Sequence, residues 1–257
     1  MKIIILSVMG VFLMAISVFA GHPLVTDDTG TQGRGKAQVE VGVSFFNDKD
    51  KADEFTTFKT QGGEAAVGVS VGLLDSLDIV LSAPYAWYNL DENDVRLNRA
   101  DGILDIGFDV KWRFFEKNGW SLALKPGIIL PTGHEDESLG AGRTAYRIFL
   151  IGTKEFEPVS IHANVGYFRN ENNIGEHKDI WLASVAAEME IIQNLKLLAN
   201  IGVEKSPLPD LDNHPAFALG GITYNISEKI IIDAGIKYGV TSTETDWTYL
   251  AGLTIKF

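Results

Sequence analysis

The sequence of 257 residues contains no cysteine, so no disulfide framework and no acylated lipoprotein cysteine is available to it. Basic residues are scarce as well, since 22 Lys and Arg stand against 34 Asp and Glu, for a formal net charge of −12. A nucleic-acid partner is not expected, because it would require clustered Lys and Arg. After residue 20, no stretch approaches the roughly eighteen consecutive apolar residues of a membrane-spanning helix.

The first twenty residues have the pattern of a cleavable signal peptide. Lys2 supplies a positive charge, an almost uninterrupted apolar run follows to Phe19, and small residues around Val18 and Ala20 suit a signal peptidase. An N-terminal membrane anchor is the alternative, but the run is slightly short and no basic cluster follows it. We predict a signal peptide over residues 1–20, cleaved near Ala20, and export of the remaining chain.

From residue 36 onward, apolar and polar residues alternate in segments of similar length, separated by Gly, Asn, Asp, Ser and Pro. Alternation with a period of two places successive side chains on opposite faces of a β-strand. Residues 21–35 lack this pattern and form a polar N-terminal segment, expected in the periplasm. Twelve strands are predicted over 36–47, 61–73, 77–88, 102–115, 120–130, 144–156, 159–170, 179–191, 195–206, 215–226, 229–240 and 246–257.

The connections between these strands alternate in length. Short ones follow the even-numbered strands, as at Asp75-Ser76 and Glu157-Pro158, whereas most of those after odd-numbered strands are longer, as at 48–60 and 89–101. Outer-membrane barrels have tight periplasmic turns and longer external loops, and a soluble sandwich has no reason to sort its turns in this way. The prediction is therefore all-β: a transmembrane, up-and-down antiparallel β-barrel of 12 strands over 36–257, in the cell outer membrane.

One face of each strand is apolar enough to meet lipid. The last strand carries Trp247, Tyr249, Leu253 and Phe257 on one side, and aromatic residues near strand ends are typical of barrel girdles. Phe257 at the carboxy terminus resembles the signal read by the barrel-assembly machinery. The predicted partners are accordingly outer-membrane lipid, that machinery and a small-molecule solute.

The opposite faces carry charges that would be costly against lipid, at roughly 2–4 kcal/mol for each Lys or Arg near the midplane. We expect them to face a lumen, where they either close it with salt bridges or line a solute path. Arg147 and Lys154 share a strand but differ in phase, which predicts a bulge near Gly152. The candidate lumen-lining residues are Asp105, Asp109, Lys111, Arg113, Lys125, Arg147, His162, Asn164, Glu188, Glu204, Asp233 and Lys237.

No catalytic, metal or cofactor site is predicted. Ser160, His162 and Asn164 are residue types suited to nucleophilic catalysis, but neighbours two apart on a strand lie about 6–7 Å apart, too far for direct hydrogen bonds. Polar filling of the lumen explains them better. The segment His134-Glu135-Asp136-Glu137 could bind a divalent cation, and an acidic, solvated loop tip is the simpler interpretation. The chain has no P-loop, dinucleotide fingerprint or HExxH motif.

The segment His22-Pro23-Leu24-Val25-Thr26-Asp27-Asp28-Thr29-Gly30-Thr31, together with Leu130-Pro131-Thr132-Gly133, resembles the outer-membrane barrel family named for a MetA pathway of phenol degradation. In this family the opening motif more often has Arg where His22 stands. The resemblance implies a barrel and uptake of small solutes, aromatic or apolar ones among them. It also singles out Thr26, Asp27 and Asp28, which could cap or plug the periplasmic mouth or simply form an Asp-stabilised turn.

These observations predict a passive outer-membrane channel or transporter for small solutes. A structural barrel whose lumen is closed by salt bridges is the main alternative, and an outer-membrane hydrolase is the third.

Overall fold

The computed structural model describes residues 21–209, 211 and 213–257. The predicted signal peptide therefore lies outside the described residues. Within them, no helix has the length and apolar character needed to cross a membrane.

Alternating residues produce β-strands throughout, and each strand is named here with its bounds. One 3-10 turn, η1 (Glu135–Glu137), interrupts the series. The strands are β1 (Ala37–Lys51), β2 (Thr57–Leu74), β3 (Leu77–Glu92), β4 (Val95–Ile103), β5 (Ile106–Lys117), β6 (Trp120–Leu130), β7 (Ala145–Phe156), β8 (Val159–Arg169), β9 (Asp179–Ile192), β10 (Leu195–Glu204), β11 (Ala216–Asn225), β12 (Ile230–Gly239) and β13 (Trp247–Lys256).

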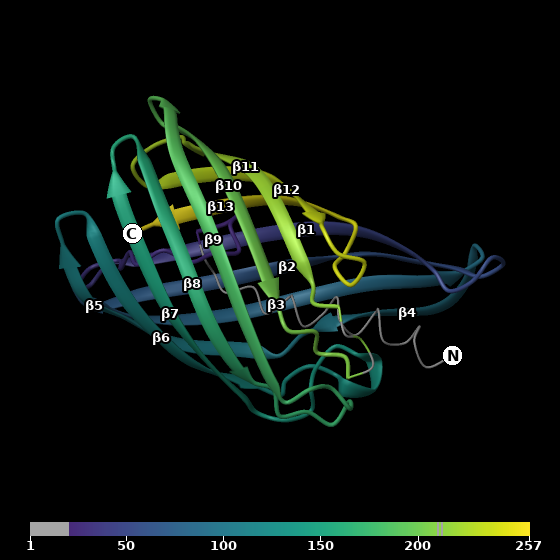
Figure 1. Cartoon of the computed structure of the whole chain (residues 1–257). Helices are drawn as coiled ribbons and strands as arrows, with labels where there is room; N and C mark the ends of the chain where they lie inside the picture. The colour runs from purple at the N-terminus through teal and green to yellow at the C-terminus, as the bar shows by residue number, and fades with distance from the viewer. Residues whose placement is uncertain (1–20, 210, 212) are drawn as a thin grey trace.

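The sheet closes on itself as a barrel (Figure 1). Neighbouring strands pair antiparallel, and β1 pairs with β13 from Gln38↔Lys256 to Asn47↔Trp247, which removes both sheet edges. β4 and β5 together form a single barrel strand, because both pair with β3, one along each half of it. The twelve-stranded, up-and-down antiparallel barrel predicted from the sequence is confirmed.

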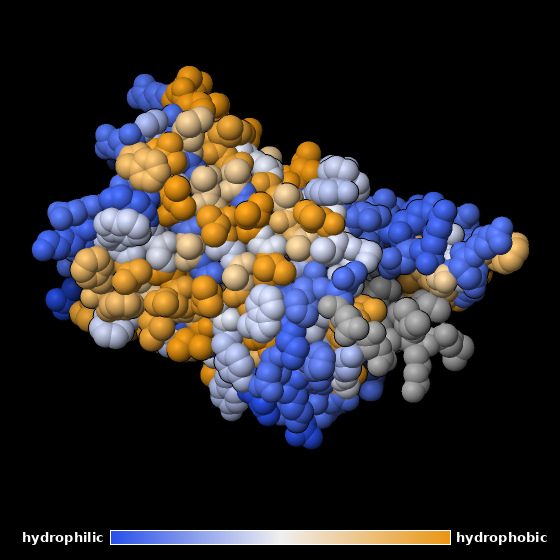
Figure 2. Space-filling model, in the orientation of Figure 1, coloured by the Kyte–Doolittle hydropathy of each residue, from blue (hydrophilic) through white to orange (hydrophobic). Residues whose placement is uncertain are grey.

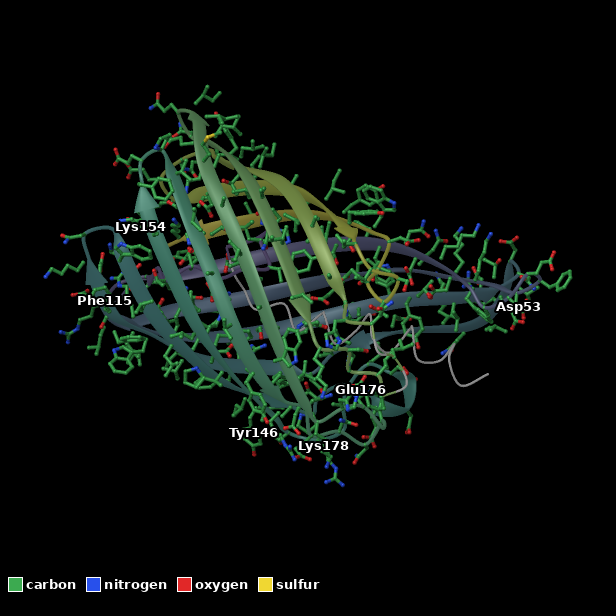
Figure 3. All side chains as sticks on the ribbon, viewed as in Figure 1. Asp53, Phe115, Tyr146, Lys154, Glu176 and Lys178 are labelled. Atoms are coloured by element: carbon green, nitrogen blue, oxygen red, sulfur yellow. The ribbon has the colours of Figure 1, made fainter. Side chains whose placement is uncertain are left out.

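The connections between strands are of different lengths at the two ends of the barrel. We call the end with the tight turns, such as 75–76 and 157–158, the short-turn end, and the opposite end the long-loop end. Figure 3 shows Phe115 and Lys154 at the short-turn end and Asp53 at the tip of the β1–β2 hairpin, which extends far beyond the barrel wall. The predicted loops 48–60 and 89–101 are therefore wrong in large part: continuous pairing carries β1, β2, β3 and β4 through them. Outside a bilayer both faces of a strand can be polar, so the alternation that reveals a strand disappears.

The predicted strand 102–115 is interrupted at Leu104 and Asp105. The Leu104 amide donates to the Pro84 carbonyl, while the Asp105 carboxylate accepts from the amides of Gly133 and Ala141, both at 2.9 Å. Asp105 thus holds the 131–144 loop instead of lining the open lumen. Leu104, which regular alternation would put on the same outer face as Phe108, is instead buried inside with Phe58 and other apolar residues. A side chain that anchors a loop through main-chain amides cannot be recognised from alternation alone.

The bulge predicted near Gly152 is also wrong, because β7 pairs with β6 and β8 in continuous register. Arg147 points inward and is buried. Lys154 lies on the outer face at the strand end, where its amine donates to the Asn118 carbonyl and lies over the Trp120 ring. A long cationic side chain at the end of a strand can reach polar groups from the outer face. Arg147 can therefore face inward and Lys154 outward on one regular strand, without a bulge.

The outer surface of the barrel wall is apolar. Figure 2 shows hydrophobic residues gathered over the barrel strands, with hydrophilic residues at the short-turn end and over the projecting hairpin. Exposed apolar side chains come from most strands, among them Leu81, Leu150, Val165, Ile201 and Ile236. An exposed apolar belt between polar ends is what a bilayer-embedded barrel requires.

Candidate functional site: a plugged polar lumen

The N-terminal segment, residues 21–35, turns into the lumen just before β1 begins. Gly33 and Gly35 adopt positive φ angles of 84° and 76°, which favour glycine, and they reverse the chain direction at the short-turn end. The Gly35 amide donates to the Gly72 carbonyl and the Thr31 hydroxyl to the Asp75 carbonyl, both at 2.8 Å. The segment therefore lies inside the barrel as a plug, and we refer to residues 22–31 by that name.

Asp27 is the centre of the plug. Its carboxylate accepts one hydrogen bond from Lys111 at 2.9 Å and one from Lys125 at 2.8 Å, and the side chains of all three residues are buried. When the Asn164 amide is assigned in the orientation that satisfies its hydrogen bonds, its oxygen accepts from the Asp27 N–H at 2.6 Å and its nitrogen donates to the Asp27 carbonyl at 2.8 Å. Buried charges are tolerated when they are paired in this way, and here one acidic residue of the plug pairs with two lysines of the wall.

Uncharged hydrogen bonds hold the plug on either side of Asp27. The Asn200 side-chain oxygen accepts from the amides of Val25 and Thr26, while the Thr26 hydroxyl donates to the Ser184 hydroxyl at 2.7 Å. Beyond Asp27, the Thr29 hydroxyl shares a hydrogen bond with Ser121. These partners lie on β6, β9 and β10, so the plug crosses the lumen from wall to wall.

The first residues of the plug pack closely against the wall at a glycine position. His22 Nδ1 is 2.5 Å from the Asp233 carboxylate, and its ring lies over Gly252. A Cβ built on Gly252 would come 2.5 Å from the same ring nitrogen. Glycine at this position is therefore needed for the close approach of the plug to β13, a function that alternation could not indicate.

Asp28, the third residue of the predicted motif, lies beside Asp27 and contacts Lys111 at 3.4 Å. Its carboxylate also caps the following turn by accepting from the Gly30 amide. In the structure the segment occupies the lumen, and the Asp28 side chain stabilises its turn.

A cavity of about 460 Å³ remains between the plug and the short-turn end. His162 lines it, with its Nδ1 2.9 Å from the Thr153 hydroxyl and its Nε2 3.8 Å from Glu188, which in turn pairs with Lys196 at 2.8 Å. Ser160 also lines the cavity, but the His162 ring nitrogen is engaged by Thr153. The lumen below the plug is open space lined by polar groups.

Asp109 and Arg147 form a second charge pair within the lumen. The guanidinium donates twice to the carboxylate, at 2.7 and 2.6 Å, and both side chains are almost fully buried. A bidentate pair has the geometry that a buried ion pair needs. Arg113, in contrast, lies at the short-turn rim, where it pairs with Glu116 and donates to the Asp75 carbonyl.

Near the long-loop end the lumen is acidic. Glu204 is the last residue of β10, Lys237 lies on β12, and Lys237 donates to Glu244 at 2.9 Å. Glu176, from the loop 170–178, accepts a hydrogen bond from Asn170 at 2.8 Å. Figure 3 shows Glu176 among the loops at this end, with Tyr146 and Lys178 at the outer rim.

Sequence reasoning missed Glu176, Glu244 and Asn170 because they lie in loops, where no period assigns a face. No group of three or more His, Cys, Asp or Glu side chains in the described part of the chain is arranged to hold a metal ion.

Phe257 extends the pairing between β1 and β13, where the barrel closes. Its amide donates to the Ala37 carbonyl at 2.8 Å, next to the β1–β13 ladder, and its ring is exposed on the outside. Recognition by the assembly machinery stays a prediction.

Comparison with known proteins agrees with the fold. The translocator domain of the autotransporter NalP from Neisseria meningitidis is 11% identical, with a TM-score of 0.59, covering 96% of this chain and 94% of that one. The KdgM porin is 8% identical, with a TM-score of 0.55, covering 85% and 99%. A KdgM porin structure in complex with disordered oligogalacturonate gives 0.54 at 6% identity over 85% and 99%. At these identities the likeness shows the fold, that of an outer-membrane β-barrel.

No curated protein matches the chain. A family model described as "Putative MetA-pathway of phenol degradation" matches residues 20–257, which includes the plug and every strand of the barrel. This chain is an outer-membrane β-barrel that belongs to that family.

Proposed function

We propose that the barrel is a channel for passive passage of small solutes across the outer membrane, closed by its plug and opened when the plug moves. The observation that carries this proposal is the nature of the plug contacts. Asp27, Thr26 and Thr29 are held by hydrogen bonds and ion pairs, and water can replace such contacts at small net cost. The polar cavity below the plug supplies space on the short-turn side.

An apolar cluster on the inner face of the barrel, covered by the 131–144 loop, could contact solutes with an apolar or aromatic body, as the family name suggests, once that loop moves aside. Phe58, Tyr88, Leu90 and Leu139 form a buried cluster against which Phe46 packs. These side chains come from the inner face of β2 and β3 and from the 131–144 loop. An apolar surface beside polar groups is the usual composition of a small-molecule site.

A structural barrel, permanently closed, is the second candidate, and the bidentate Asp109–Arg147 pair favours it. Such a pair fixes two wall strands to each other and occupies lumen space. We propose no catalytic role, since the Thr153 hydroxyl next to His162 is buried and already accepts from the Thr29 amide at 3.1 Å.

Because the chain has no native cysteine, a disulfide lock tests the channel directly. Thr26 and Ser184 are in side-chain contact at 2.7 Å, so the double variant T26C/S184C can tie the plug to β9. In planar bilayers we expect single-channel openings of the wild type, loss of openings in the oxidised variant and recovery on reduction. The single variants T26C and S184C, treated with the same oxidant, are the controls.

Each outcome decides between the candidates. Openings that persist in a fully cross-linked barrel would place the path away from the plug and contradict the proposed mechanism. If neither the wild type nor the reduced variant opens while both remain folded, the barrel is structural.

A further inference from the structure

The acidic groups near the long-loop end have too little positive charge to balance them. We call Glu64, Glu176, Glu204 and Glu244 the acidic cluster. Glu204 interacts electrostatically with both Glu176 and Glu244, and Lys237 is the cation that interacts with Glu64 and Glu204. Lys237 is also committed to Glu244 through its hydrogen bond at 2.9 Å. Among the described residues, three of these carboxylates therefore interact with one ammonium group, and Glu176 is linked to them through Glu204.

Buried acceptors without donors occur in the same place. Glu176 Oε1, Glu244 Oε2 and the side-chain oxygen of Asn170 are enclosed and have no hydrogen-bond partner, although the three residues are 7%, 3% and 0% exposed. An enclosed acceptor without a donor is destabilising, because it has lost its hydrogen bonds to water and gained none in return. Burial raises the pKa of Glu176 to about 8, and the charge of Glu204 acts in the same direction. A positively charged hydrogen-bond donor would satisfy these oxygens and would lower the pKa of Glu176 again.

An ammonium group is a donor of this kind, because it is all donor and carries the opposite charge. The surroundings indicate what the ammonium is attached to. Glu64 pairs across the strands with Ala86, a member of the buried apolar cluster that also contains Phe58 and Tyr88. The residues of this cluster are 0–7% exposed and Leu139 of the 131–144 loop covers them, so a ligand could place its charged end among the carboxylates and its apolar body against this cluster once that loop moves aside.

We propose that the acidic cluster is a binding site for small organic cations, primary ammonium groups on an apolar or aromatic body, and that it selects such solutes for passage. This inference rests on the proposed channel function for its transport part, whereas the binding part stands without it. The site already binds one ammonium group, because the native Lys237 donates to a carboxylate oxygen of Glu244.

Binding is tested with three probes of nearly equal shape: benzylammonium, benzyl alcohol and benzoate. Titration calorimetry of the folded barrel in micelles should show benzylammonium binding more tightly than the other two. The isosteric double variant E176Q/E204Q should weaken benzylammonium at least tenfold and leave benzyl alcohol unchanged. E171Q is the matched control: it lies in the same loop as Glu176, but its carboxylate pairs outward with Arg169 and Lys178.

Equal binding of all three probes, or benzylammonium binding unchanged in E176Q/E204Q, would overturn the proposal. Heat-modifiable mobility on gels confirms that each variant is folded.

Passage is measured separately, from reversal potentials in planar bilayers with benzylammonium chloride and with sodium benzoate. A channel that passes benzylammonium in preference, and loses the preference in E176Q/E204Q, supports both proposals. A channel that opens without this preference contradicts selection but not the channel. A barrel that binds benzylammonium and never opens contradicts the channel and leaves the binding site established.

Discussion

Two charged regions of this lumen differ in how completely their charges are balanced. The paired cluster, made of Asp27, Asp109, Lys111, Lys125 and Arg147, matches each acid with basic groups at 2.6–2.9 Å. In the acidic cluster three carboxylates interact with Lys237, Glu176 interacts with Glu204, and enclosed oxygens of Glu176 and Glu244 have no donor among the described residues. The paired cluster is complete without a ligand, whereas the acidic cluster is completed by one. Structural and binding roles are thus separated along one lumen, and four substitutions test that separation.

The largest effect is expected at the Asp109–Arg147 pair. Arg147→Met leaves the Asp109 carboxylate buried without its two donors, which should lower the free energy of unfolding by about 3–5 kcal/mol. The double variant D109L/R147M removes both charges and should recover most of this loss. Urea unfolding in micelles measures both. A double variant as unstable as R147M would mean that the pair contributes through shape, not through charge balance.

Asp27→Asn should have the next largest effect, because it removes the charge that Lys111 and Lys125 share. The loss of charge-assisted hydrogen bonds corresponds to about 1.5–3 kcal/mol in favour of the displaced plug. With a Thr26→Cys reporter in both backgrounds, alkylation of the buried cysteine should be at least tenfold faster in D27N. Unchanged alkylation would show that the neutral contacts of Thr26 and Asn200 alone hold the plug.

Glu204→Gln should stabilise the barrel, whereas Asp27→Asn should favour displacement of the plug. Removing one of several mutually repelling carboxylates should raise the free energy of unfolding by up to about 1 kcal/mol at neutral pH. Chemical denaturation of E204Q beside the wild type, with E171Q as the control, measures this difference. A clear destabilisation would place Glu204 in a satisfied network and remove the contrast between the two clusters.

The smallest effect is a pH dependence confined to the loop 170–178. Because the pKa of Glu176 is raised to about 8 by burial, the folded loop prefers the protonated acid. Stability from this group is complete below its ordinary pKa and is lost as pH rises through about 8. Hydrogen exchange of the loop amides should therefore show more frequent opening at pH 8.5 than at pH 5, after correction for intrinsic rates. The difference should vanish in E176Q.

Alternation and turn length predicted the barrel, its strand number and most inward-facing charges, including Asp109, Lys111 and Arg147. These features are local, since the side of a strand that a residue faces follows from its parity. The partners of those charges were not predictable. Asp27 meets Lys111 and Lys125 across 84 and 98 residues, which requires a closed barrel with the segment folded back inside it. The wall glycine at Gly252 and the loop residues Glu176 and Asn170 carry no periodic signal at all.

Because the plug is continuous with β1 through Gly33 and Gly35, its return to the lumen is an intramolecular event. A tether of a few residues keeps a displaced segment at an effective concentration of the order of millimolar beside its own site. Reclosure is then independent of how many copies of the protein the membrane holds and requires no second molecule. The resting state of the pore is set within each chain, and whatever opens it must compete with a segment that never diffuses away.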